Sequence, residues 1–136
     1  MNYVIVGACA AGLAAAEAVR KADAKGNITM LTEEAYFPYS RPSISYFLKG
    51  KVKESDMALR KPSFYKTNNI NVITNAKVTS IDRKNKTVKV GKKSYPYDKL
   101  CRLADSLTAC IHHSLRLHNK AFFTLNGHIC AKSVML

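Results

Sequence analysis

The sequence contains no tryptophan. It has only 9 acidic residues against 22 lysines and arginines, which gives a net charge of +13. Its four cysteines are scattered, without the spacing of a disulfide framework, so we expect reduced thiols in a cytoplasmic protein. No apolar run approaches the ~18 residues of a membrane span. Residues 1–16 are uncharged, but no Lys or Arg precedes the apolar run, which disfavours a signal peptide. We expect no membrane interaction.

The excess of positive charge raises the alternative of a nucleic-acid-binding protein. The positive density is greatest from Lys77 to Lys99, where lysines flank what look like the turns of a small β-meander. Lysines at turns and on solvated strand faces need no partner. The sequence also lacks a recognition-helix pattern and an aromatic RNA-binding sheet motif. We therefore expect no nucleic acid, and this function remains a distant alternative.

The first recognisable motif begins at residue 4. A short apolar run is followed by a glycine and then by an alanine-rich stretch. Gly7 allows a tight turn, and Gly12 allows a helix to pack closely on the preceding strand. The free N–H groups and the positive dipole end of that helix would face a pyrophosphate. The middle glycine of the usual pattern is Cys9 here, and its side chain would crowd the phosphates. A turn that binds nothing is the competing interpretation.

The second strand of this unit ends in an acidic pair. Residues 28–31 are apolar apart from Thr29, and Glu33 and Glu34 follow. Glu33 lies 21 residues beyond Gly12, the usual offset of a carboxylate that accepts hydrogen bonds from ribose hydroxyls. Strand, glycine turn, helix, strand and acid together indicate a βαβ site for the ADP half of a dinucleotide.

The loop after the acids makes the assignment more specific. Residues 33–45 read Glu-Glu-Ala-Tyr-Phe-Pro-Tyr-Ser-Arg-Pro-Ser-Ile-Ser, with Ser43 placed to cap a short helix. This stretch, together with residues 78–83, 86–90 and 95–100, resembles the FAD- and NAD(P)H-dependent pyridine nucleotide-disulfide oxidoreductase superfamily. Within it, the NADH oxidase, rubredoxin or ferredoxin reductase and nitrite-reductase-like flavoproteins are most similar. The resemblance covers about residues 1–100.

The resemblance implies a set of cofactor-binding residues. The turn would surround the FAD pyrophosphate, Glu33 or Glu34 would hold the adenosine ribose, and Arg41 would reach phosphate or the flavin side. An arginine also suits phosphate in its own right, because its guanidinium offers a bidentate fork; a solvated loop cation is the alternative. Pro42 would lie near the isoalloxazine, and the backbone around Lys77–Val78 would lie along the adenine. The full set is Gly7, Ala8, Cys9, Ala11, Gly12, Glu33, Glu34, Arg41, Pro42, Lys77 and Val78.

The chemistry implied is that of an FAD-dependent NAD(P)H oxidoreductase, with NAD(P)H as co-substrate. The thiol branches of the superfamily place a redox cysteine in the helix after this loop, and residues 43–48 contain none. Hydride would thus enter FAD from NAD(P)H and leave as electrons to a protein acceptor or oxygen. We assign no catalytic residue. A dinucleotide-binding module or truncated fragment without turnover is the main alternative.

The composition changes after residue 100. Residues 101–136 hold all four histidines, three of the four cysteines and a single acidic residue, Asp105. We expect residues 1–100 to form a partial FAD-binding domain and residues 101–136 a divergent tail outside the family fold. The tail's cysteines and histidines lack paired ligand spacing, so we assign no metal site. Nothing after Leu100 would build a nicotinamide site, so this chain alone should not turn over NAD(P)H at an enzyme-like rate.

The expected fold is α/β, a Rossmann-like three-layer domain with a small antiparallel β-meander, incomplete on its C-terminal side. We expect strands at 2–6, 27–31 and 71–73, helices at 11–24 and 43–49, helical turns at 55–67, and antiparallel strands within 76–98. The strand that closes the domain in the family should be altered or missing, and residues 103–117 could form a modest amphipathic helix.

Overall fold

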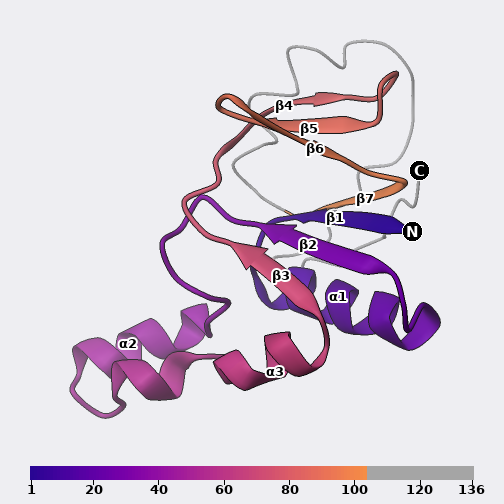
Figure 1. The fold of residues 1–136 in the computed structure, drawn as a ribbon. Coiled ribbons are helices and arrows are strands. Elements are labelled where there is room, and N and C mark those ends of the chain that lie inside the picture. Colours follow the sequence, from indigo (N-terminus) through magenta and orange to yellow (C-terminus); the bar gives the residue numbers. More distant parts are fainter. Residues whose placement is uncertain (104–136) are drawn as a thin grey trace, which may run out of the picture.

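The computed structural model describes residues 1–103, and Figure 1 shows their arrangement. A four-stranded parallel sheet lies at the centre, and a three-stranded antiparallel sheet covers one of its faces. In chain order the elements are β1 (Asn2–Val6), α1 (Ala10–Ala22), β2 (Asn27–Leu31), the 3-10 helix η1 (Arg41–Ser43), α2 (Ile44–Leu48), the 3-10 helix η2 (Glu54–Met57), α3 (Pro62–Thr67), β3 (Ile70–Ile73), β4 (Val78–Asp82), β5 (Thr87–Val90), β6 (Lys93–Pro96) and β7 (Lys99–Arg102).

Alternation along the strands produces the three layers. In β1, Ile5 faces α1 and α3, where it packs in a buried cluster with Leu13 and Tyr65. Val4 and Val6 face the opposite side, toward the antiparallel sheet. Successive strand residues point to opposite faces, so the buried apolar run Val4 to Val6 of β1 suits a sheet that is covered on both sides. The expected three-layer Rossmann-like fold with a β-meander is confirmed.

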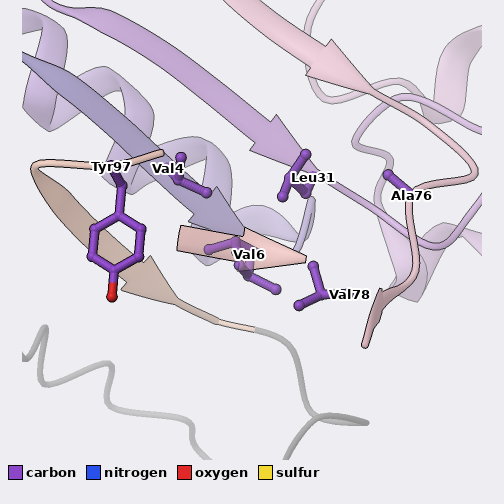
Figure 2. Close-up of a cluster of buried hydrophobic side chains, with 7 residues drawn as sticks. Val4, Val6, Leu31, Ala76, Val78 and Tyr97 are labelled. Atoms are coloured by element: carbon purple, nitrogen blue, oxygen red, sulfur yellow. The ribbon is translucent and has the colours of Figure 1, made fainter. Parts of the chain in front are cut away.

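The layer between the two sheets is a compact apolar core. Figure 2 shows Val4, Val6 and Leu31 of the parallel sheet meeting Ala76, Val78 and Tyr97. Val88 completes this cluster and has no exposed surface. The β-meander is therefore anchored through its apolar face, whereas its lysine-rich turns remain in solvent.

The central sheet has the strand order β3-β2-β1-β7, and every neighbouring pair is parallel. β7 forms at the sheet position of the closing strand, so the alternative that this strand is missing is wrong. It pairs with β1 along its whole length, with Leu100 opposite Val4 and Cys101 opposite Ile5. Leu100 packs against the core of Figure 2 and Cys101 against the helical side. Side chains thus continue to alternate between the two faces of the sheet beyond residue 100, where the amino-acid composition changes.

The remaining elements agree with the expected map to within a few residues. The capping role expected for Ser43 is wrong, because its backbone is already helical and its hydroxyl donates to the Ser40 hydroxyl at 2.9 Å. The expected helix over 103–117 lies outside the described residues. None of the helices within residues 1–103 combines the length and the apolarity needed to cross a bilayer.

One arginine joins two connections of the fold. The half-buried Arg20, in the last turn of α1, donates to the backbone carbonyls of Asp23, Ala24 and Gly26 at 2.8–3.0 Å. It also donates to the carbonyls of Asn68 at 2.8 Å and Asn69 at 3.0 Å, which lie between α3 and β3. These bonds fix the link from α1 to β2 against the link into β3.

We expect Arg20→Ala to lower the free energy of unfolding by about 2 kcal/mol or more, because several carbonyls lose a charged donor together. Urea denaturation followed by circular dichroism measures this change. Lys21→Ala is the matched control, since Lys21 is the exposed neighbour on the same helix turn and should change stability by only a few tenths of a kcal/mol. Equal midpoints for the two variants would contradict the role of Arg20.

The hydroxyl of Tyr65 is buried without a hydrogen-bond partner. The side chain is 3% exposed and packs against Phe37 and Phe64, with ring centroids 5.2 and 5.6 Å away. Desolvation raises the pKa of Tyr65 to about 12. The unfolded chain, in which the tyrosine ionises near pH 10, binds fewer protons than the folded protein between pH 10 and pH 12. The free energy of unfolding therefore falls across that window.

We expect Tyr65→Phe to match or slightly exceed the native stability at pH 7, because it removes a hydroxyl that lacks a partner. Above pH 10 the variant should retain about 2 kcal/mol that the native protein loses by pH 12. Chemical denaturation at pH 7, 10 and 11.5 measures this difference. Tyr46→Phe is the control, since Tyr46 is 54% exposed, and it should follow the native protein throughout.

Candidate dinucleotide-binding site

The turn between β1 and α1 depends on two glycines. Gly7 has a φ of 109°, in the region that favours glycine, and its N–H donates to the Leu31 carbonyl at 2.9 Å. Gly12 lies on the first turn of α1, and a Cβ there would overlap the Gly7 carbonyl. The turn thus requires glycine at position 7 for its backbone conformation and at position 12 for the close approach of helix and strand, as the sequence pattern predicts.

The N-terminus of α1 is suited to an anionic ligand. Cys9 is the N-cap residue in extended conformation, its side chain makes no capping hydrogen bond, and the first turn contains no acidic residue. The Cys9 carbonyl accepts the first helical bond, from Leu13 at 2.9 Å. Early backbone N–H groups, including those of Ala10 and Ala11, have no intrahelical acceptor. A 13-residue helix presents them with its positive dipole end, which is the chemistry that binds phosphate.

The cysteine that replaces the middle glycine turns toward β7. Its Sγ lies 3.5 Å from the carbonyl oxygen of Leu103, in hydrogen-bonding geometry. Nearby, burial and then the neighbouring Cys9 raise the pKa of the Cys101 thiol. A thiol with a raised pKa is a poor nucleophile at neutral pH. Cys9 and Cys101 are free thiols, and they help to pack the end of the closing strand.

The two acids after β2 are both engaged with cations. The carboxylate of Glu33 lies 2.9 Å from Lys77 Nζ, and that of Glu34 lies 2.7 Å from Arg41 Nη2. Tyr39 adds to the second pair, since its hydrogen bond to Glu34, followed by desolvation, raises the pKa of Tyr39. All four ion-paired side chains are at least 37% exposed, so each pair is weak and open to exchange for a ligand.

Backbone hydrogen bonds hold the acidic segment against the link between β3 and β4. Thr32 donates to the Ile73 carbonyl at 3.0 Å and accepts from Ala76 at 2.7 Å. Asn75 donates to the Glu34 carbonyl at 3.1 Å. Lys77 and Val78 are thus placed beside the end of β2, with Val78 buried as the first residue of β4.

The proposed site residues fall into two groups, both at the carboxyl ends of parallel strands. Gly7, Ala8, Cys9, Ala11 and Gly12 form the turn after β1 and the start of α1, while Glu33, Glu34, Arg41, Pro42, Lys77 and Val78 follow β2 and β3. Pro42 is in η1 directly after Arg41. The carboxyl edge of an open α/β sheet is where such folds bind ligands.

A separate hollow of about 500 Å³ lies between the β3–β4 link and the β5–β6 hairpin. Among the proposed site residues it is lined by Lys77 alone, together with other side chains such as Asn75, Thr79, Lys92 and Lys93. The hollow is therefore distinct from the phosphate turn. Within residues 1–103, no group of three or more histidine, cysteine or acidic side chains could hold a metal ion.

Sequence reasoning missed three contacts at this edge. The ion pair between Glu33 and Lys77 joins segments that are far apart in the sequence, and no local sequence pattern predicts it. The role of Tyr39 as a partner of Glu34 was equally hidden. The contact from Cys9 to Leu103 was detectable in principle, because the alternation at Leu100 and Cys101 indicates a strand that returns beside β1.

A glycine-dependent phosphate turn on a parallel sheet, with acids at the end of the second strand, defines a dinucleotide-binding α/β domain. The profile of the pyridine nucleotide-disulphide oxidoreductase family matches residues 1–101. The chain belongs to this family.

Named relatives agree with this membership. The chain is 43% identical over 103 residues to a rubredoxin-NAD(+) reductase of Pseudomonas putida, covering 74% of this chain and 26% of the relative. It is 39% identical over 109 residues to a NADH-rubredoxin oxidoreductase of Clostridium acetobutylicum, covering 78% and 28%. The chain thus spans about a quarter of the length of these relatives.

Solved structures share the fold. The crystal structure of NADH:rubredoxin oxidoreductase from Clostridium acetobutylicum matches with a TM-score of 0.68 and 35% identity, covering 76% of this chain and 28% of the other. The reductase of a covalent putidaredoxin reductase–putidaredoxin complex matches with a TM-score of 0.72 and 30% identity, covering 76% and 25%.

We expect Gly12→Val to abolish dinucleotide binding and to destabilise the fold by about 3 kcal/mol, because the side chain forces α1 away from β1. Cys9→Gly should retain or improve binding, since glycine is acceptable at an N-cap and allows closer approach of phosphate. Calorimetric titration with FAD and with ADP measures both effects. A clear loss of affinity in Cys9→Gly would contradict this expectation and assign the thiol a role in binding.

Proposed function

We propose that residues 1–101 are the FAD-binding domain of an NAD(P)H-dependent flavoprotein oxidoreductase. The observation that carries the proposal is the positive end of α1 at the glycine turn, which no side chain caps and which lies at the same sheet edge as the acids after β2. The first feature suits a pyrophosphate and the second suits a ribose, which together are the ADP half of FAD.

Each part of the site has a proposed role. The N–H groups at the start of α1, around Ala11 and Gly12, bind the pyrophosphate. Glu33 accepts hydrogen bonds from the ribose hydroxyls, exchanging its weak pair with Lys77 for the ligand. The backbone at Lys77–Val78 lies along the adenine.

The flavin side of the proposed site lies at η1. Arg41 supplies charge toward phosphate or flavin, and Glu34 and Tyr39 hold the loop from which it projects. Pro42, the next residue of η1, lies near the isoalloxazine. A short, rigid 3-10 turn suits this place because proline fixes its own backbone torsion.

FAD, when bound, supplies the hydride and electron chemistry, and this chain supplies binding and orientation. NAD(P)H is the proposed co-substrate. We propose a redox protein as the electron acceptor, because the named relatives are reductases of rubredoxin and the matched structure contains putidaredoxin. The absence of cysteine from residues 41–48 favours such an acceptor over a disulfide substrate. A binding module without turnover is the second candidate, because the features identified within residues 1–103 suit the phosphate and ribose of a dinucleotide.

We expect FAD and ADP to bind at least tenfold more tightly than riboflavin, because the contacts identified are to phosphate and ribose. Fluorescence titration for the flavins and calorimetry for ADP measure the affinities. Glu33→Gln should weaken both FAD and ADP about tenfold through the lost charged acceptor. Glu54→Gln, at an exposed residue of η2, is the matched control and should leave both affinities unchanged. Equal or tighter binding of riboflavin would refute the proposed site.

A further inference from the structure

Two half-buried cysteines lie at the junction of the phosphate turn and the closing strand β7. Cys9 is the N-cap residue of α1, and its side chain does not cap the helix. Its Sγ lies instead 3.5 Å from the carbonyl oxygen of Leu103, the residue directly after β7. Cys101 is a residue of β7 and stands opposite Ile5 of β1. The pairing of β1 with β7 thus brings together two thiols that are far apart in the sequence.

The two thiols converge on the helical side of the parallel sheet. The N–H of Leu103 donates to the Val6 carbonyl at 2.7 Å, so the backbone of Leu103 prolongs the pairing of β7 with β1. Cys101 and Leu103 are two positions apart and share one face of the strand, where both pack against the cluster between the sheet and the helices. The Cys9 sulfur reaches this same end of β7, and its thiol is near enough to contribute to the raised pKa of Cys101.

The proposed function uses neither sulfur. The phosphate turn binds through backbone N–H groups, and FAD supplies the electron chemistry. Two free thiols at one place have a chemistry of their own, because a sulfenic acid formed on one condenses with the other to give a disulfide. We propose that Cys9 and Cys101 form such a disulfide when the protein meets a peroxide, and that a dinucleotide bound at the turn slows this oxidation. The second part rests on the proposed function.

The oxidation has two steps that together consume one hydrogen peroxide. The thiolate of Cys9 attacks one peroxide oxygen, the O–O bond breaks, and the hydroxide that leaves takes up a proton to become water. The thiolate of Cys101 then attacks the sulfenic acid sulfur of Cys9, the S–O bond breaks and the S–S bond forms. The second hydroxide also leaves as water. The two sulfurs lose two electrons in all, and the peroxide gains them.

The surroundings of the two thiols set the order of reaction. Burial, followed by the neighbouring Cys9, raises the pKa of Cys101, and a protonated thiol is a poor nucleophile toward peroxide. Cys9 therefore reacts first, and Cys101 resolves the sulfenic acid. The finished bond fastens the turn after β1 to β7. A pyrophosphate held at this turn covers Cys9, which is why a bound dinucleotide should protect the pair.

The test treats the full 136-residue chain with a small excess of hydrogen peroxide, blocks the remaining thiols with iodoacetamide and identifies linked peptides by mass spectrometry. We expect a peptide pair joined through Cys9 and Cys101 that dithiothreitol separates. ADP at a saturating concentration, verified by calorimetry, should lower the rate of its formation at least tenfold. Riboflavin, which has no phosphate, should leave the rate unchanged at the same concentration.

Cysteine variants provide the controls. Cys101→Ser should give no linked peptide, and its Cys9 should continue to the sulfinic acid, which dithiothreitol does not reduce. The double variant Cys110→Ser with Cys130→Ser, at positions outside the described residues, should form the bond like the native chain. Circular dichroism verifies that all variants are folded.

Free thiols at both positions after peroxide treatment, sulfinic acid at Cys9 of the native chain, or a bond from Cys9 to any other cysteine would overturn the pair. Equal rates with and without bound ADP would overturn the protective effect. Lack of ADP binding in calorimetry would contradict the proposed function and with it the protection, whereas the linked peptide would still decide whether Cys9 and Cys101 react together.

Discussion

The approach of α1 to β1 is the contact on which the rest of the structure depends. Gly12 has no side chain, and the helix therefore rests directly on the Gly7 carbonyl. The close contact between Gly12 and the Gly7 carbonyl sets the direction of α1. That direction places the N-terminal amides of the helix at the edge of the sheet. It also leaves Leu13 and Ala16 in contact with β1 and β2, where they form the helical side of the core. One missing Cβ thus determines the core and the phosphate site together.

The parts that could be predicted from sequence are those with local signals. Gly7, Gly12 and the apolar run before them specify strand, turn and helix because each position has a steric reason. The meander was readable from alternating residues between lysine-rich turns. β7 is hard to predict because the composition changes after Leu100, although the alternation of strand faces continues through Cys101. Amino-acid composition describes residues 101–136 as a whole. The formation of the four-residue strand β7 depends instead on whether its own side chains alternate correctly between the two faces of the sheet.

The acidic end of the site shows a different limit. The offset from Gly12 identifies Glu33, and the family resemblance implies Glu33 or Glu34, as the ribose ligand, but neither separates the roles of the two acids. The folded chain pairs one with Lys77 and the other with Arg41, through exposed contacts that depend on tertiary structure. Such pairs have no periodicity and contribute little stability, so sequence patterns do not record them. They matter because they orient side chains that would otherwise sample many rotamers.

The strand order has a consequence for how the chain folds during synthesis. β1 lies inside the sheet, with β2 on one side and β7 on the other. Its second neighbour is made of residues 99–102, so almost the whole described chain must leave the ribosome before β1 is paired on both edges. Closing so long a loop is slow compared with forming the local β1–α1–β2 unit. Until then, one edge of β1 keeps its backbone N–H and C=O groups unpaired beside the apolar side chains of Val4, Ile5 and Val6, which is the kind of surface that chaperones protect.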